Sequence, residues 1–215
     1  MKKYLAELIG TFALVFCGTG AIIINEQTNG AIGNLGIALS FGLVILVMVF
    51  TFGNISGAHF NPAVTITLWL TKLLNFKEVI PYLTSQLLGA FMATFILKFL
   101  FPENINLGAT LPTGSLLQSF IFEFILTFFL LTVILNVTQS SKEISMFAAI
   151  AIGSTICLEA IFGGPISGAS MNPARSISPA IFTGNTNQLW IYIFAPISGA
   201  IFAGYIWKSM KTERK

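Results

Sequence analysis

The stretch "SGAHFNPAVT" at residues 56–65 returns as the similar "SGASMNPARS" at residues 167–176, with six of ten residues identical. Each copy combines small residues, an Asn-Pro-Ala tripeptide and a run that can form a helix. Asn is among the best helix N-caps, and Pro is tolerated at the first helical position because its missing N–H would be unpaired there anyway. Each copy therefore predicts an irregular segment followed by the start of a helix.

The two predicted helices are too short to cross a membrane alone. The runs after Ala63 and Ala174 extend for roughly 8–12 residues, or about 12–18 Å at the helical rise per residue, against a hydrocarbon core roughly 30 Å thick. Two half-helices that enter from opposite faces can meet at their N-termini and form one composite span. Their irregular backbone is tolerated within a membrane only where it lines a water-filled cavity, so the motif predicts a pore.

The rest of the chain is strongly apolar. Of 215 residues, 55% are hydrophobic, 9% are charged and none is Asp, which leaves too little polar surface for a soluble domain. Six stretches are long enough to span a bilayer, near residues 4–24, 34–53, 81–101, 117–137, 144–162 and 188–207. We expect an all-α membrane protein with six transmembrane helices and two re-entrant half-helices, which form a single channel domain over residues 1–215.

Positive charge predicts the orientation, because Lys and Arg accumulate in cytoplasmic loops. When six spans are threaded alternately, one side collects Lys2, Lys3, Lys72, Lys77, Lys142, Lys208, Lys211, Arg214 and Lys215. The opposite loops, 25–30 and 102–115, contain no Lys or Arg. We therefore expect both termini on the cytoplasmic side of the cell (inner) membrane. The net charge of +3 follows from this topology and predicts no nucleic-acid partner. Lys98, which can snorkel, and Arg175 are the exceptions.

The two halves of the chain match in more than the motif. "ELIGTF" at 7–12 pairs with "EFILTF" at 123–128, and "QLLGA" at 86–90 pairs with "PISGA" at 196–200. Each half holds three spans, and an odd number inserts the second half upside down, as in the inverted repeats of many transport proteins. We expect repeat 1 in residues 1–110 and repeat 2 in residues 111–215.

A pore between the two helix N-termini would favour neutral solutes. Each N-terminus is equivalent to roughly +0.5 elementary charge, which opposes cations. The amides of Asn61 and Asn172 can donate to a passing oxygen while their own oxygens cap backbone donors, and water oriented in this way cannot relay a proton. An ion- or proton-coupled transporter is the alternative. Glu7 and Glu123, at equivalent intramembrane positions, can either relay protons or accept hydrogen bonds from the loop backbone that they support.

These motifs resemble the aquaporin, or major intrinsic protein, family over essentially the whole chain. The resemblance rests on the paired Asn-Pro-Ala tripeptides, the "ExxxTF" starts of spans one and four, and the sequence "NPARS". The resemblance is to channels of the bacterial type, combined with a wide selectivity filter like that of nodulin-like channels. It implies a passive channel for water and small uncharged solutes that excludes ions and protons, assembled in the lipid bilayer as a homotetramer with one pore per subunit. The pore tripeptides are Asn61, Pro62, Ala63 and Asn172, Pro173, Ala174.

The resemblance also implies a selectivity filter, formed by Phe41, Ala160, Ala169 and Arg175. An Arg inside a bilayer faces a cavity or a partner, which independently marks Arg175. Orthodox water channels have His at the position of Ala160, so two alanines predict a wider and less polar ring. "GPISGASMNPARS" at 164–176 resembles plant nodulin-like channels. Glycerol channels of the bacterial type usually have Asp where this chain has Ser176, so glycerol, urea and metalloid acids all stay open as solutes.

The remaining candidates concern the loops and isolated polar residues. Backbone carbonyls are expected to line the pore at Gly57, Ala58, His59, Phe60, Gly168, Ala169, Ser170 and Met171. His59 is the only histidine, so the sequence predicts no metal site, no cofactor and no catalytic constellation; a pH gate at His59 is the alternative to a structural role. Cys17 and Cys157 are expected to be buried free thiols. Glu159 has no counterpart in the other half, and its role is open.

Overall fold

The computed structural model describes residues 1–211, which form six long helices and three short ones. The long helices are α1 Lys2–Gln27, α2 Gly33–Ser56, α4 Phe76–Leu100, α5 Leu116–Thr138, α7 Ala148–Ser167 and α9 Leu189–Met210. All six are long and apolar enough to cross a membrane, as the sequence predicts. The short helices are α3 Pro62–Leu70, α6 Lys142–Ser145 and α8 Pro173–Thr183.

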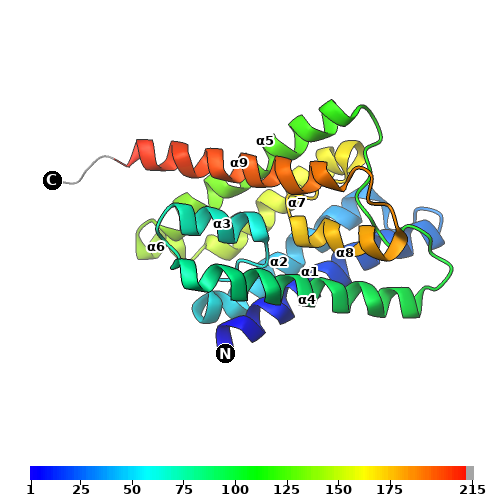
Figure 1. The fold of residues 1–215 in the computed structure, drawn as a ribbon, viewed down its shortest axis with the longest axis horizontal. Helices are drawn as coiled ribbons and strands as arrows, with labels where there is room; N and C mark the ends of the chain where they lie inside the picture. The colour runs from blue at the N-terminus through cyan, green and yellow to red at the C-terminus, as the bar shows by residue number, and fades with distance from the viewer. Residues whose placement is uncertain (212–215) are drawn as a thin grey trace.

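The two half-helices α3 and α8 lie end to end between α4 and α9 (Figure 1). They contain 9 and 11 residues, which together correspond to about 30 Å of helix. Each C-terminal end receives a lysine: Lys208 Nζ donates to the carbonyl of Leu70 at 2.7 Å, and Lys98 Nζ donates to the carbonyl of Phe182 at 3.3 Å. A cation at a helix C-terminus offsets the helix dipole, so Lys98 has a structural partner.

The two halves of the chain pack alike around close helix crossings. α1 packs on α4 as α5 packs on α9, and α2 packs on α7 between the halves. A Cβ at Gly42 would lie 2.7 Å from the carbonyl oxygen of Gly153, and a Cβ at Gly153 would lie 2.6 Å from that of Gly42. Likewise, Cβ atoms at Gly89 and Gly199 would each lie 2.2 Å from a backbone oxygen of the neighbouring helix. These four positions therefore have no room for a side chain.

Two helix boundaries differ clearly from those predicted. α4 begins five residues before Pro81 because Asn75 caps it, with Oδ1 accepting from the backbone N–H of Lys77 at 3.0 Å; the charged first turn hides this start from a hydropathy reading. α7 begins at Ala148, after the separate turn α6, and continues to Ser167 through Pro165. Pro165 has no N–H for the carbonyl of Ile161, and Asn34 Nδ2 donates to that oxygen at 2.6 Å instead.

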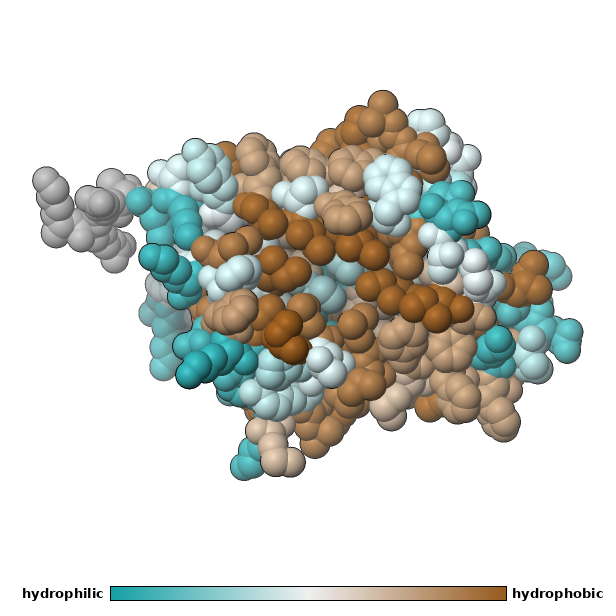
Figure 2. Space-filling view, in the orientation of Figure 1, coloured by the Kyte–Doolittle hydropathy of each residue, from teal (hydrophilic) through white to brown (hydrophobic). Residues whose placement is uncertain are grey.

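The surface is that of a multi-pass integral membrane protein. Hydrophobic side chains cover the middle of the molecule, and hydrophilic side chains gather at its two ends (Figure 2). Many large apolar residues are exposed, including Phe95 and Phe99 at 62% and 78%, which is expected where lipid replaces water as the solvent. The prediction of buried thiols is wrong for Cys17, which is exposed on α1, and Cys157 is only half-buried.

Candidate functional site

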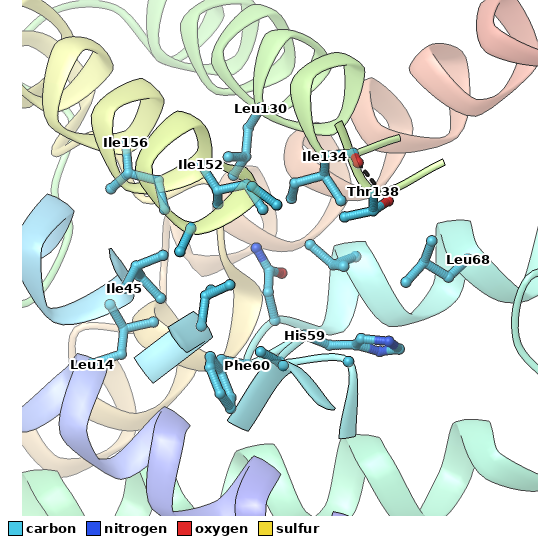
Figure 3. A pocket seen from close by; sticks show the side chains of 18 of the residues that line it. Leu14, Ile45, His59, Phe60, Leu68, Leu130, Ile134, Thr138, Ile152 and Ile156 are labelled. Carbon is cyan, nitrogen blue, oxygen red and sulfur yellow. Dashed lines mark hydrogen bonds between the residues drawn. The ribbon is translucent and has the colours of Figure 1, made fainter. Parts of the chain in front are cut away.

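A cavity of about 760 Å³ is lined by residues of both motif loops, 57–61 and 168–172. It extends from Thr138 and Lys142, at the ends of α5 and α6, to Arg175 on α8. Apolar side chains form much of its wall, with Leu130 and Ile152 on one side and Leu14 and Phe60 on the other (Figure 3). No motif marks Leu14, Leu130 or Ile152, so sequence reasoning missed these three, whereas Phe60 belongs to the first motif.

The tips of α3 and α8 begin at the two motif asparagines. Asn61 has an extended backbone, and its Oδ1 accepts from the backbone N–H of Ala63 at 2.8 Å. Asn172 repeats this geometry, with Oδ1 accepting from the N–H groups of Ala174 at 3.0 Å and Arg175 at 3.4 Å. Both asparagines line the cavity, so the positive ends of the two helices face the same space.

The asparagines also tie the two loops together. Asn61 Nδ2 donates to the carbonyl of Met171 at 2.7 Å, and Asn172 Nδ2 donates to the carbonyl of Phe60 at 2.9 Å. A side-chain amide has two N–H donors. One donor of each amide therefore crosses to the opposite loop, and a single N–H per asparagine is left for a solute, which is fewer than the sequence suggests.

The two loops share an unusual backbone. Positive φ angles occur at Ala58 (51°) and Phe60 (49°) in the first loop and at Ala169 (40°) and Met171 (53°) in the second. Such conformations are unfavourable for residues with a side chain, by about 1–3 kcal/mol each, and persist only where the surroundings enforce them. The same pattern in both loops therefore requires a matching support for each.

Two buried carboxylates supply that support. Glu7 accepts from the backbone N–H groups of His59 at 3.0 Å and Phe60 at 2.8 Å. Glu123 accepts from those of Ser170 and Met171, both at 2.8 Å. A serine hydroxyl donates to each carboxylate as well, at 2.7 Å and 2.8 Å. Both glutamates are fully buried and neither lines the cavity, so they hold the loops from behind.

The four predicted filter residues all line the same cavity, as Phe41, Ala160, Ala169 and Arg175. The Arg175 guanidinium carbon lies 5.1 Å from the centre of the Phe41 ring. Arg175 Nη1 donates to the carbonyl of Gly108 at 2.7 Å, a partner that no sequence signal marks. Within residues 1–211, Arg175 Nε and Nη2 have no hydrogen-bond partner although the side chain is only 2% exposed. Both nitrogens are themselves buried, so these donors lie beside the cavity without being exposed to it.

Several predicted pore residues lie behind the wall of the cavity. Seven of the eight predicted carbonyl positions belong to lining residues; the exception is Gly168, whose Cα faces Thr110. The tripeptide residues behind the wall are Pro62, Ala63, Pro173 and Ala174, which are buried and shape the helix starts. Of each tripeptide, the asparagine is the residue that lines the cavity.

His59 is a lining residue with a structural partner. Its Nδ1 lies 3.0 Å from Thr65 Oγ1, and its ring centre lies 4.9 Å from that of Tyr82. Among the described residues, no three His, Cys, Asp or Glu side chains are grouped to hold a metal ion. The contacts fix the ring at the first loop.

Glu159 is buried without a hydrogen bond. It is 4% exposed, and both carboxyl oxygens are without partners in the described part of the chain. It does not line the cavity, although its neighbour Ala160 does. An unsatisfied buried polar group costs about 1–3 kcal/mol, so Glu159→Met is expected to raise the melting temperature in detergent and to leave water permeability unchanged. Loss of water flux in this variant, with the fold intact, would show that the carboxyl serves transport.

The six spans, the two half-helices that meet tip to tip and the cavity past their junction define a membrane channel. The chain belongs to the major intrinsic protein family, whose family model matches residues 1–207. It is a channel and not an enzyme, in agreement with the sequence-based interpretation.

Comparisons with individual proteins agree with this assignment. The chain is 44% identical to Nodulin-26 of Glycine max over 100% of this chain and 80% of that protein. It is 41% identical to Aquaporin NIP1-1 of Oryza sativa subsp. japonica over 100% of this chain and 76% of that protein. Its fold is similar to the X-ray structure of the aquaglyceroporin from Plasmodium falciparum, with a TM-score of 0.84, 27% identity and coverage of 97% and 96% of the two chains. The aquaporin fold is thereby confirmed.

Proposed function

We propose that this channel conducts water and small neutral solutes, such as glycerol, urea and metalloid acids, and excludes ions and protons. The observation that carries the proposal is the pair of helix N-termini at one cavity, where the amides of Asn61 and Asn172 each keep a second N–H without a partner in residues 1–211. A solute oxygen can accept from both amides, and the helix dipoles oppose a cation at the same point.

The second part of the proposal concerns the solute range. The side chains of Ala160 and Ala169 are single methyl groups, and both residues line the cavity that Phe41 and Arg175 also line. A ring with two methyl groups leaves room for a polyol or urea, while Arg175 repels cations and donates to oxygen. The similar fold of the aquaglyceroporin from Plasmodium falciparum, whose name refers to glycerol, supports a filter wide enough for a polyol.

The coupled transporter is the weaker alternative. In that alternative Glu7 and Glu123 relay the protons, but neither of them lines the cavity. Glu7 and Glu123 are fully buried behind the loops and occupied by backbone donors. A passive pathway therefore fits these residues better than a proton relay does.

The proposal extends to assembly and topology. We propose a homotetramer with one pore in each subunit. Each subunit is one domain built of repeats 1–110 and 111–215, lies in the inner membrane and has both termini on the cytoplasmic side. The alternation of lysines across the spans supports the topology. The bacterial type stays a prediction, since the relatives named above come from plants and a parasite.

Stopped-flow light scattering on reconstituted liposomes tests the function. We expect fast shrinkage under a sorbitol gradient, fast re-swelling under glycerol and urea gradients, and proton leakage no greater than that of empty vesicles, measured with an entrapped pH dye. Water flux equal to that of empty vesicles would contradict the channel, and dissipation of an imposed proton gradient together with solute uptake would favour the transporter.

A further inference from the structure

Helix α1 presents two glycines to the cavity wall. Gly10, Leu14 and Gly18 follow one another at four-residue spacing, which places them on one face of the helix. Leu14 lines the cavity. The two glycines on either side of it face an aromatic ring each, Phe60 at Gly10 and Phe41 at Gly18.

The Phe41 ring lies directly against the backbone of Gly18. A Cβ at this position would lie 2.1 Å from Phe41 Cε1 and 2.5 Å from both Cδ1 and Cζ. Real Cβ atoms do not approach other heavy atoms so closely. The ring therefore occupies the space that any side chain at position 18 would need.

The position of this ring bears on the width of the cavity. Phe41 is a lining residue, and the Arg175 guanidinium carbon lies 5.1 Å from the ring centre. Because Phe41 lines the cavity and the Cε1 edge of its ring lies against Gly18, we expect a ring that is displaced from Gly18 to enter the cavity. A methyl group at position 18 would therefore narrow the passage without itself entering it.

We propose that Gly18 is a specificity-determining residue. It sets the width of the filter because it leaves the space in which the Phe41 ring lies away from the cavity. Gly18 acts through Phe41 and is a positioning residue, not a pore contact. The inference rests on the proposed function, because it takes Phe41, Ala160, Ala169 and Arg175 as the filter.

The chain offers a matched control on the same helix. Gly20 is also buried, but the nearest atom to a Cβ there is Leu97 Cδ2 at 3.4 Å, which is ordinary van der Waals contact. Gly20→Ala therefore makes the same chemical change two residues away without displacing a ring. Gly10 is unsuitable, since a Cβ there would lie 2.0 Å from Phe60 Cε1 and Phe60 belongs to the first loop.

The test compares glycerol and water permeability of these variants in liposomes. For Gly18→Ala we expect the ratio of glycerol to water permeability to fall about tenfold, a discrimination that one methylene group supplies in a tight pocket. Gly20→Ala keeps the wild-type ratio. An equal loss of both permeabilities, an unchanged ratio for Gly18→Ala, or the same fall for Gly20→Ala would overturn the proposal.

A double variant separates positioning from damage to the fold. In the Phe41→Leu background, Gly18→Ala should leave the ratio unchanged, because the ring that it displaces is absent. A fall of about tenfold in the glycerol-to-water permeability ratio in that background would overturn the proposal. This comparison stays possible when Gly18→Ala alone does not fold. If the wild-type protein conducts water only, the solute part of the proposed function fails. In that case the inference still predicts lower water permeability for Gly18→Ala than for Gly20→Ala, and equal values would overturn it.

Discussion

Glu123→Ala is expected to abolish water flux and to destabilise the protein severely. The substitution removes the acceptor of two backbone N–H groups, those of Ser170 and Met171, and of the Ser167 hydroxyl, all at 2.8 Å. A buried donor left without an acceptor costs about 1–3 kcal/mol, so three such donors exceed about 3 kcal/mol. The strained loop between α7 and α8 then loses what enforces its positive φ angles. The measurements are the melting temperature in detergent and the osmotic shrinkage of liposomes.

Two further variants test whether the loss of stability and water flux comes from the missing acceptor at position 123. Glu123→Gln keeps one carbonyl acceptor and should fall between wild type and Glu123→Ala in stability. Glu143→Ala removes an exposed carboxylate from α6 and should change neither measurement. A stable Glu123→Ala protein with full water flux would show that the second loop holds its shape without the carboxylate. A stable Glu123→Gln protein that conducts water but has lost a measurable proton flux would instead support the relay interpretation.

Much of the fold could be predicted from local rules. Asn61 and Asn172 are N-caps followed by Pro, and both half-helices begin where this pattern indicates. All six spans were predicted from the length of apolar stretches. The wrong end of α7 has a long-range cause. Pro165 and the glycines before it predict the end of a helix, but Asn34, 127 residues away along the chain from Ile161, satisfies the carbonyl that Pro165 leaves free.

The site could be predicted only in part, because some of its contacts join residues far apart in the chain. The sequence places Arg175 after the second tripeptide, but its Gly108 partner is 67 residues away. The amide of Asn61 reaches Met171, 110 residues away, and only folding shows that this bond uses one of its two donors. Glu7 and Glu123 could be inferred because each repeat needs a support for its loop, whereas nothing repeated marks Glu159.

Ala160→His is expected to lower glycerol and urea permeability by a factor of about 10–100, the discrimination that small changes in pocket volume supply. The imidazole would occupy space that the Ala160 methyl group leaves in the cavity that Arg175 also lines. It would also add a hydrogen-bonding group to a ring with few of them. Water is smaller and should still pass, so the ratio of solute to water permeability falls. The measurement is stopped-flow light scattering under sorbitol, glycerol and urea gradients.

The control for this prediction is Ser154→His, which places the same side chain on an exposed position of α7 and should leave every permeability unchanged. Because the displacement at Gly18 and the added ring at position 160 narrow the filter from different helices, their effects should converge on the same solutes. Unchanged glycerol and urea flux in Ala160→His, with the protein folded, would mean that the cavity is narrowest elsewhere and that the four filter residues are wrongly assigned. Equal loss of water and solute flux would mean that the imidazole blocks the passage outright, so that the ring is already narrow in the wild-type channel.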